Sequence, residues 1–146
     1  ASVNTHDLPP AAGYLEYGHV KLREQLGLLS GPVEEFQKSA EAEHNAMLSM
    51  LVDEGYLDAS ALEDELANEN EIIDALYRGL KGSPCKLMAA SIVDAVGEKR
   101  TQNQPGTSNE YPNWRIPLAD GDGNVVPLEQ LFDNTRLQEI AAIMRG

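Results

Sequence analysis

The sequence predicts a mainly α-helical chain with one or two short strands, in the order of two βα units. Three observations support this fold class. Apolar residues recur at helical spacing through residues 11–82, residues 86–93 form one short apolar run, and a long polar loop precedes a terminal helix. Two parallel strands alone leave buried backbone groups unpaired, so we expect this chain to be a piece of a larger α/β protein.

The first segments are a loop and two long helices. The opening ASVNTHDLPP ends in two prolines, which indicates a strand that exits into a loop, because each proline keeps the preceding residue out of the α region. Over residues 11–29 one helical stripe is formed by Leu15, Leu22, Leu26 and Leu29. A second helix is predicted from Pro32, which suits a first turn, to Gly55.

Two further helices complete the region up to residue 82. Ser60 and Glu63 have the spacing of a capping box and predict a short helix. Residues 70–80 then place one apolar stripe inward before Gly82, made of Ile72, Ile73, Leu76 and Leu80.

The composition and the periodicity of the sequence change after residue 82. Residues 86–93 (KLMAASIV) lie between Pro84 and Gly97 and are typical of a buried strand. A long loop rich in Gln, Asn, Pro and Gly follows at 101–113, and residues 116–118 and 125–126 flank the turn ADGDGN as a small hairpin. Residues 127–146 then predict a helical turn and a last helix, with Leu137, Ile140, Ala141 and Met144 on its inner face.

Composition excludes several classes of partner. The formal net charge of −13 and the pI near 4.5 argue against nucleic acid and against an anionic membrane surface. Cys85 cannot form an intrachain disulfide, and we expect it to be a buried, inert thiol in a cytoplasmic protein. The chain opens with Ala1 rather than Met, which suggests that it was cut from something longer.

Common metal and nucleotide sites are not predicted. The three histidines show no metal-ligand spacing, and no cysteine pair exists. The Asp-x-Asp-x-Asn pattern at 120–124 lacks the glycine and the bidentate glutamate of a calcium loop, because Val125 and Leu131 occupy those positions. Phosphate-binding loops and a serine-nucleophile elbow are absent, so we predict no metal and no cofactor.

Two polar blocks remain as candidates for function. The first is Thr5-His6-Asp7, directly after the first presumed strand, where the bare sequence favours a loop-capping role for Asp7. The second covers residues 102–115 (QNQPGTSNEYPNWR), which could equally be a surface loop anchored by a buried Trp114. Its length and polarity favour a functional loop.

Both blocks resemble segments of the amylomaltase (4-α-glucanotransferase) family of the α-amylase clan. THDLPPAAGYLEYGHVKLREQLGLL is similar to the segment that leaves the seventh strand of the family's (β/α)8 barrel, and QNQPGTSNEYPNWRIPL is similar to the loop after the eighth. One departure is that Gly13-Tyr14-Leu15 stands where many members carry an aromatic pair.

The resemblance implies that this chain is the C-terminal fragment of the barrel, its last two βα units. On that reading residues 1–10 are the exit of strand 7, 11–82 a helical region, 86–93 strand 8, 101–118 a loop on the active-site face, and 127–146 the terminal helices. The enzymes transfer α-1,4-glucan segments between maltooligosaccharides with retention. Asp7 matches the third catalytic carboxylate, and His6 and Asn103 match substrate-binding residues; the nucleophile and the acid/base would precede Ala1.

The fragment reading has two consequences. The fragment alone should be inactive, and it should self-associate through the exposed strand 86–93. A free-standing acidic helical module that binds a protein partner, or a hydrolase of the same clan, would be the alternative reading.

Overall fold

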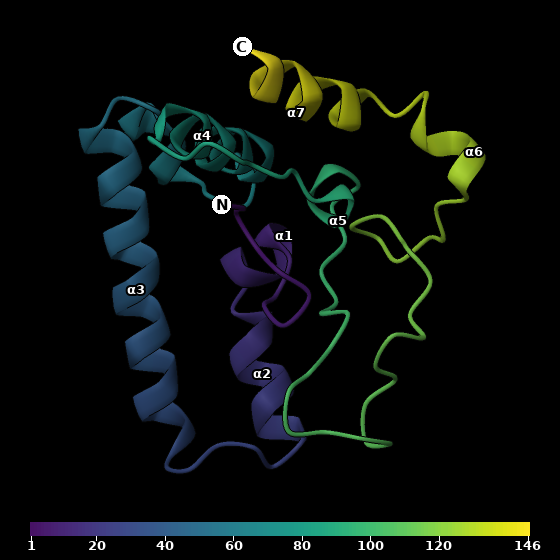
Figure 1. Ribbon diagram of the computed structural model, residues 1–146. Coiled ribbons are helices and arrows are strands. Elements are labelled where there is room, and N and C mark those ends of the chain that lie inside the picture. Colours follow the sequence, from purple (N-terminus) through teal and green to yellow (C-terminus); the bar gives the residue numbers. More distant parts are fainter.

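Helices make up nearly all of the regular structure in the computed structural model, which describes residues 1–146 (Figure 1). The α-helices are α1 (Ala11–Leu15), α2 (Gly18–Gln25), α3 (Val33–Asp53), α4 (Glu69–Gly82), α5 (Ile92–Ala95), α6 (Leu128–Leu131) and α7 (Thr135–Arg145), and η1 (Ala59–Glu63) is a 3-10 helix. The mainly helical prediction is confirmed.

The helix predicted over residues 11–29 is divided into α1 and α2. Tyr17 lies between them with φ 57°, in the left-handed region that a continuous right-handed helix cannot contain. The next helix begins as predicted, because Pro32 is the N-cap residue of α3. Gly55 follows the end of α3 with φ 75°, the conformation that makes glycine a good helix stop.

The cap of η1 differs from the prediction. Asp58, not Ser60, caps this helix, since its Oδ1 accepts hydrogen bonds from the backbone N–H of Ser60 at 2.8 Å and from the Ser60 hydroxyl at 2.6 Å. The following helix α4 agrees with its pattern: Ile72 and Ile73 are fully buried, and Leu76 and Leu80 pack against the core.

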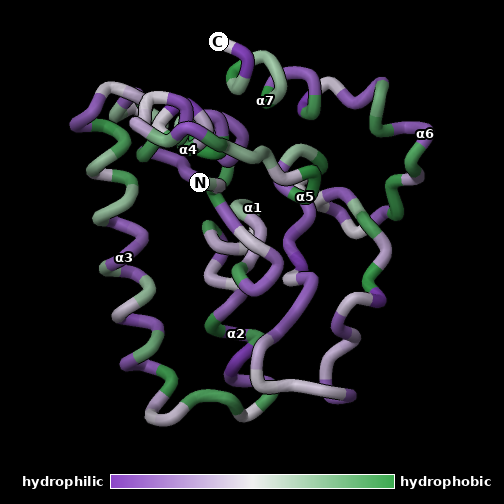
Figure 2. The backbone as a smooth tube through the Cα atoms, viewed as in Figure 1, coloured by the Kyte–Doolittle hydropathy of each residue, from purple (hydrophilic) through white to green (hydrophobic).

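One apolar core joins the helices. Thirteen buried residues form it, twelve from six helical elements and Leu57 from the connection between α3 and η1: Ala11, Ala12, Leu15, Leu48, Leu51, Leu57, Ala61, Ile72, Ile73, Ala75, Tyr77, Ala95 and Ile140. Helix α4 is central, because it packs against α1, α3 and α7. The backbone that runs down from α5 is mostly hydrophilic, in contrast to the alternating faces of α3 (Figure 2). The core therefore belongs to the helices, and the polar loop lies beside it.

The predicted strand at 86–93 is not formed. The run forms only one bridge, a parallel one between Ala89 and Ser2. Around it the Ala89 N–H donates to the carbonyl of Ala1 at 3.0 Å, and the Ala1 ammonium donates to the carbonyl of Leu87 at 2.7 Å. Ile92 and Val93 already belong to α5. A strand needs a neighbouring strand on each edge, and within this chain the first few residues are the only segment that pairs with this run. The expected side-by-side, parallel course of the two segments is nevertheless present.

The small hairpin and the last helix follow their predictions. Ala119 and Val125 form an antiparallel bridge, and Asp120 Oδ1 accepts from the N–H groups of Asp122 and Asn124 inside the turn. Asn134 caps α7 by accepting from Leu137 N–H at 2.9 Å. Ile140 is buried as expected, whereas Ala141, predicted to face inward, is exposed.

Candidate active-site loops

The first site loop, residues 5–10, presents His6 and Asp7 to solvent. The Leu8 N–H donates to the carbonyl of Thr5 at 3.1 Å, which closes a tight turn around the two side chains. Pro9 and Pro10 then lead directly into α1. Asp7 is about half exposed, with its side chain at 47% of full accessibility. A carboxylate on a hydrogen-bonded turn and open to solvent can accept hydrogen bonds from a bound ligand.

The second site loop, residues 101–118, is folded by its own side chains. Asn113 is central: its Oδ1 accepts from the Gln104 N–H at 2.8 Å, and its Nδ2 donates to the Thr107 hydroxyl at 2.8 Å. The Tyr111 hydroxyl donates to the carbonyl of Thr101 at 2.7 Å. Burial raises the pKa of the Tyr111 hydroxyl, so this donor keeps its proton at neutral pH. The loop therefore has a defined shape despite lacking regular secondary structure.

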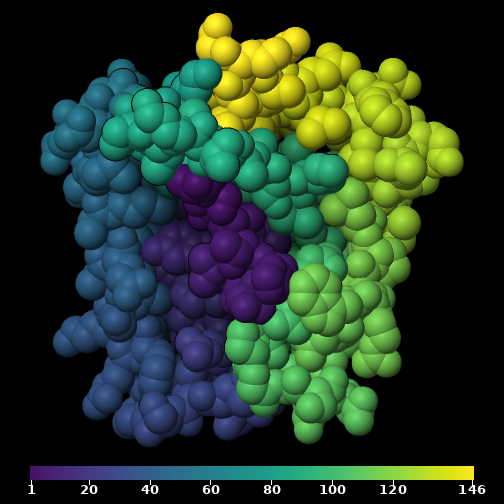
Figure 3. All heavy atoms as spheres, in the orientation of Figure 1, coloured from purple at the N-terminus to yellow at the C-terminus, as the bar shows by residue number.

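The two loops meet at the predicted site residues. Asn103 Nδ2 donates to Asp7 Oδ1 at 2.7 Å across 96 residues of sequence, and the Asn103 N–H donates to the carbonyl of His6 at 3.1 Å. His6 Nε2 lies 3.5 Å from Asp7 Oδ2. The structure thus brings Asp7, His6 and Asn103 together, while their catalytic and binding roles remain predictions. In Figure 3 the N-terminal segment lies between α3, α4 and the light green part of the chain.

Trp114 lies beside the predicted site residue His6, where the sequence alone does not place it. The alternative of a surface loop anchored by a buried Trp114 is wrong, because Trp114 is 64% exposed and its ring lies 5.1 Å from that of His6, tilted by 42°. Its backbone has φ 61°, a left-handed conformation that is rare for a bulky residue, and its N–H donates to the carbonyl of Gln102 at 3.0 Å. The one available signal was its place in a polar, Asn- and Pro-rich loop.

Two hollows flank the first loop. One, of about 380 Å³, lies between the N-terminal segment and residues 89–93, and His6 and Gln102 are in its wall. The other, of about 230 Å³, is lined by Asp7 together with Arg23, Thr101 and Gln104. Polar groups of both loops therefore face open space on either side of residues 5–8.

Three further features concern a metal, the one thiol and a membrane. No group of three or more His, Cys, Asp or Glu side chains is placed to hold a metal ion. Cys85 is exposed, so the prediction of a buried thiol is wrong; it lies in the irregular stretch after α4 that the apolar core does not cover. None of the helices has both the length and the apolar character needed to cross a membrane.

The family of this chain is decided by one match to known proteins. The sequence profile described as 4-alpha-glucanotransferase matches residues 1–121, which include both site loops. The chain belongs to the 4-alpha-glucanotransferase family. The resemblance read from the THD and N-x-P-G-T blocks is thereby confirmed.

Individual 4-alpha-glucanotransferases show how much of such a protein this chain represents. It is 48% identical over all of its 146 residues to the 4-alpha-glucanotransferase of Mycobacterium tuberculosis strain H37Rv, and it covers 20% of that protein. The enzyme of Haemophilus influenzae is 28% identical over 141 residues, with 19% of its length covered. The crystal structure of amylomaltase from Corynebacterium glutamicum superposes with a TM-score of 0.82 at 36% identity over 98% of this chain and 21% of its own. The chain thus spans about a fifth of the length of these relatives.

Proposed function

We propose that this chain is the C-terminal segment of a 4-α-glucanotransferase and that it contributes Asp7, the third catalytic carboxylate. Three findings support the proposal: the family match, the meeting of Asp7 with Asn103 and His6, and the parallel course of the segments at Ser2 and Ala89. In a (β/α)8 barrel the loops that follow parallel strands gather at one end, which is where active sites form. On this proposal residues 1–10 and 86–93 are the last two barrel segments.

The proposed reaction cleaves an α-1,4 bond of a maltooligosaccharide and passes the glucan to the 4-hydroxyl of another sugar, with retention. Asp7 would accept hydrogen bonds from hydroxyls of the sugar at the cleavage point. Those bonds strengthen as the ring gains positive charge toward an oxocarbenium ion, so Asp7 would stabilise the transition state more than the ground state. Asn103 and His6, already within reach of Asp7, would orient the carboxylate and the same sugar.

Trp114 adds an apolar surface to this polar group. Its exposed ring beside His6 can cover the face of a sugar ring while the carboxylate and amide bind its edge. The combination of one carboxylate, one amide and one exposed indole suits a polyhydroxylated, uncharged substrate. The observation that carries the proposal is the hydrogen bond from Asn103 to Asp7, which joins both family-matching blocks into one site.

The proposal is tested with Asp7→Asn in the full-length protein that contains this chain. The amide keeps the shape of the side chain and loses its charge, and we expect kcat for conversion of maltotriose to glucose and longer glucans to fall by about 10²–10³-fold. Asp53→Asn, an exposed residue at the end of α3, is the matched control and should retain wild-type turnover. Turnover above half of wild type in the Asp7 variant would remove Asp7 from the site.

The same assay separates the rival functions. A hydrolase of the clan would release reducing ends without forming longer glucans, whereas a transferase conserves the number of glycosidic bonds. The purified 146-residue chain should show neither activity, because the proposed nucleophile and acid/base lie in the rest of the enzyme. Transfer by the isolated chain would contradict that division of the active site.

A further inference from the structure

Asp94 and Glu98 are two buried carboxylates with no part in the proposed chemistry, and they are 2% and 1% exposed. We propose that they are positioning residues, each of which ties together the two ends of one site loop and so fixes Asp7 against Asn103. The inference rests on the proposed function for its catalytic meaning. It assigns a task to residues that neither the family resemblance nor the motifs single out.

Asp94 closes the first site loop. Its Oδ1 accepts from Asn4 Nδ2 at 2.6 Å and from the Ala11 N–H at 2.8 Å, and these two residues directly flank loop 5–10. Its Oδ2 accepts from the Tyr77 hydroxyl of α4 at 2.6 Å, and Tyr77 Oη in turn accepts from the Ser91 N–H at 3.0 Å. One carboxylate therefore fixes where the loop leaves the N-terminal segment and where it enters α1, and it ties both points to the core.

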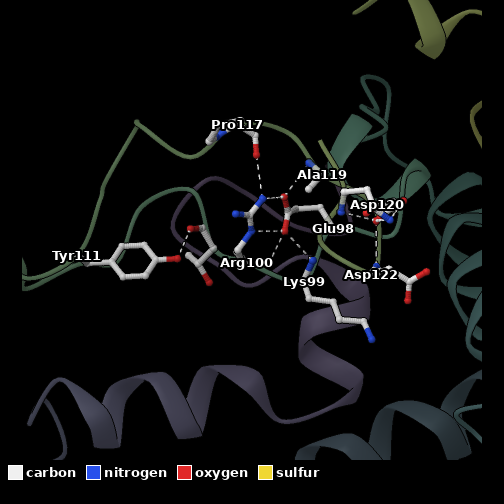
Figure 4. A network of polar contacts seen from close by, with 10 residues as sticks. Glu98, Lys99, Arg100, Tyr111, Pro117, Ala119, Asp120 and Asp122 are labelled. Atoms are coloured by element: carbon white, nitrogen blue, oxygen red, sulfur yellow. Dashed lines mark hydrogen bonds and ion pairs between the residues drawn. The ribbon is translucent and has the colours of Figure 1, made fainter. Parts of the chain in front are cut away.

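Glu98 closes the second site loop in the same manner (Figure 4). Its Oε1 accepts from the Arg100 N–H and Nε, both at 2.9 Å, and its Oε2 accepts from Arg100 Nη2 at 2.7 Å and from the Ala119 N–H at 3.0 Å. Arg100 and Ala119 directly flank loop 101–118. Arg100 Nη2 also donates to the carbonyl of Pro117 at 2.8 Å, which adds a second connection between the loop ends.

The two closures share one short segment, and this connects them to the site. Asp94 lies in α5, and the Glu98 N–H donates to the carbonyl of Val93 at 2.9 Å, so both carboxylates are held in one turn of backbone. The loops they close meet at the 2.7 Å hydrogen bond between Asn103 and Asp7. Loosening either closure would therefore change the distance between Asp7 and its partner, and a displacement of about 1 Å in an active site can cost roughly 10²-fold in rate.

The cost of burying these groups is consistent with a specific role. A buried carboxylate is unfavourable unless it is fully hydrogen-bonded. Asp94 receives three donors and Glu98 five, all from residues at loop ends or on elements packed beside them. Apolar side chains would fill the same volume without the free-energy cost of desolvating a charge, but they could not join loop ends through hydrogen bonds.

The test loosens one connection of each closure in the full-length protein and leaves both carboxylates in place. Asn4→Ala removes the Asn4 donor to Asp94, and Arg100→Lys keeps the charge but loses the two-point bond to Glu98. Matched controls are Asn45→Ala, exposed on α3, and Arg78→Lys, whose side chain is as exposed as that of Arg100, at 45%. Each variant is measured for kcat and KM with maltotriose, in wild-type and Asp7→Asn backgrounds, and for hydrogen exchange of the peptides that span 1–10 and 101–118.

We expect kcat per folded molecule to fall about 10-fold or more in Asn4→Ala and Arg100→Lys, with faster exchange in the corresponding loop and unchanged exchange in α3. The fall should shrink in the Asp7→Asn background, because a residue that acts through Asp7 loses its effect when Asp7 is absent. Unchanged kcat with lowered thermal stability, or an equal fall in both backgrounds, would overturn the inference. If Asp7→Asn itself kept wild-type turnover, the proposed role of Asp7 would fail first, and the positioning of Asp7 with it.

Discussion

Asp94 and Glu98 each bind the two ends of one site loop, yet different kinds of hydrogen-bond donor stabilise them. Asp94 is held by uncharged donors, an amide, a backbone N–H and a tyrosine hydroxyl. Glu98 is held by a guanidinium and three backbone N–H groups. Burial raises the pKa of Asp94, and its hydrogen bonds offset this only in part. Burial acts on Glu98 in the same direction, but the bonds from Arg100 and from Ala119 outweigh it and lower the pKa of Glu98.

The comparison shows that the same connection between loop ends can be made with or without a full charge. The atom in the Oδ1 position of Asp94 must accept two hydrogen bonds. The Oδ2 position instead faces Tyr77 Oη, a group that can donate or accept. Both oxygens of Glu98 face only donors. An amide in place of each carboxylate should therefore cost less stability at the first loop than at the second.

The largest expected effect comes from that exchange of carboxylate for amide. In Asp94→Asn the amide oxygen can take the position of Oδ1 while its NH₂ donates to Tyr77 Oη, so the Tyr77 hydroxyl proton is the one donor left without an acceptor. We expect a loss of about 1 kcal/mol in the opening free energy of loop 5–10. In Glu98→Gln either orientation turns an NH₂ toward buried donors. We expect the opening free energy of loop 101–118 to fall by about 2–3 kcal/mol. Native-state hydrogen exchange of the full-length protein measures both values.

Equal losses at the two positions would show that the uncharged donors around Asp94 depend on its charge after all. A Glu98→Gln protein with unchanged exchange in loop 101–118 would show instead that the connections inside that loop, such as those of Asn113, hold it without Glu98.

Gly13 provides a second, smaller test of the same region. A Cβ at this position would lie 2.2 Å from the carbonyl oxygen of Lys99, which is backbone between Glu98 and Arg100 and cannot rotate away. Gly13→Ala should therefore push α1 from this segment and reduce the free energy of unfolding by about 1–3 kcal/mol. Gly79→Ala in the last turn of α4 is the control, since its Cβ would meet nothing closer than 3.6 Å and alanine favours a helix. Thermal unfolding of both variants gives the comparison, and equal stability would contradict the tight contact.

Local patterns predicted the helices and failed where partners decide the conformation. The apolar stripes and stop residues were enough to predict α3, α4 and α7, because a helix pairs the hydrogen-bonding groups of its own backbone. The run at 86–93 has the composition of a strand, but strand pairing depends on neighbours that this chain supplies only at Ser2. The break at Tyr17 was not predictable, since nothing in its neighbourhood requires a positive φ.

The site was predicted in part, for a similar reason. Asp7, His6 and Asn103 stood in recognisable motifs, and the structure brings them together. Trp114 lies in the second motif, but its type alone also fits a buried anchor, because large aromatic residues are usually highly buried. Asp94 and Glu98 gave no signal at all: a carboxylate in VDAVGEKR reads as a surface charge, and only the folded chain shows that loop ends converge on it.

The smallest expected effect concerns pH and separates the two carboxylates by sign. The pKa of Asp94 is raised in the folded state, so its contribution to stability is fully present below the unfolded value of 3.8 and is lost as pH rises through the folded pKa. The pKa of Glu98 is lowered, so its contribution is present above the unfolded value of 4.5 and is lost as pH falls through the folded pKa. Tyr77, the titratable group that faces Asp94, has a raised pKa and remains a donor throughout this range.

Hydrogen exchange of the full-length protein from pH 4.5 to 7, corrected for intrinsic rates, can resolve this difference. The opening free energy of loop 5–10 in the wild type, minus that in Asp94→Asn, should decrease as pH rises, because only the wild type must ionise a buried carboxyl. The corresponding difference for loop 101–118 between wild type and Glu98→Gln should stay constant, because Glu98 is ionised in both the folded and the unfolded state over most of this range. A constant difference at the first loop would mean that hydrogen bonds compensate the burial of Asp94 fully, and the two closures would then be electrostatically equivalent.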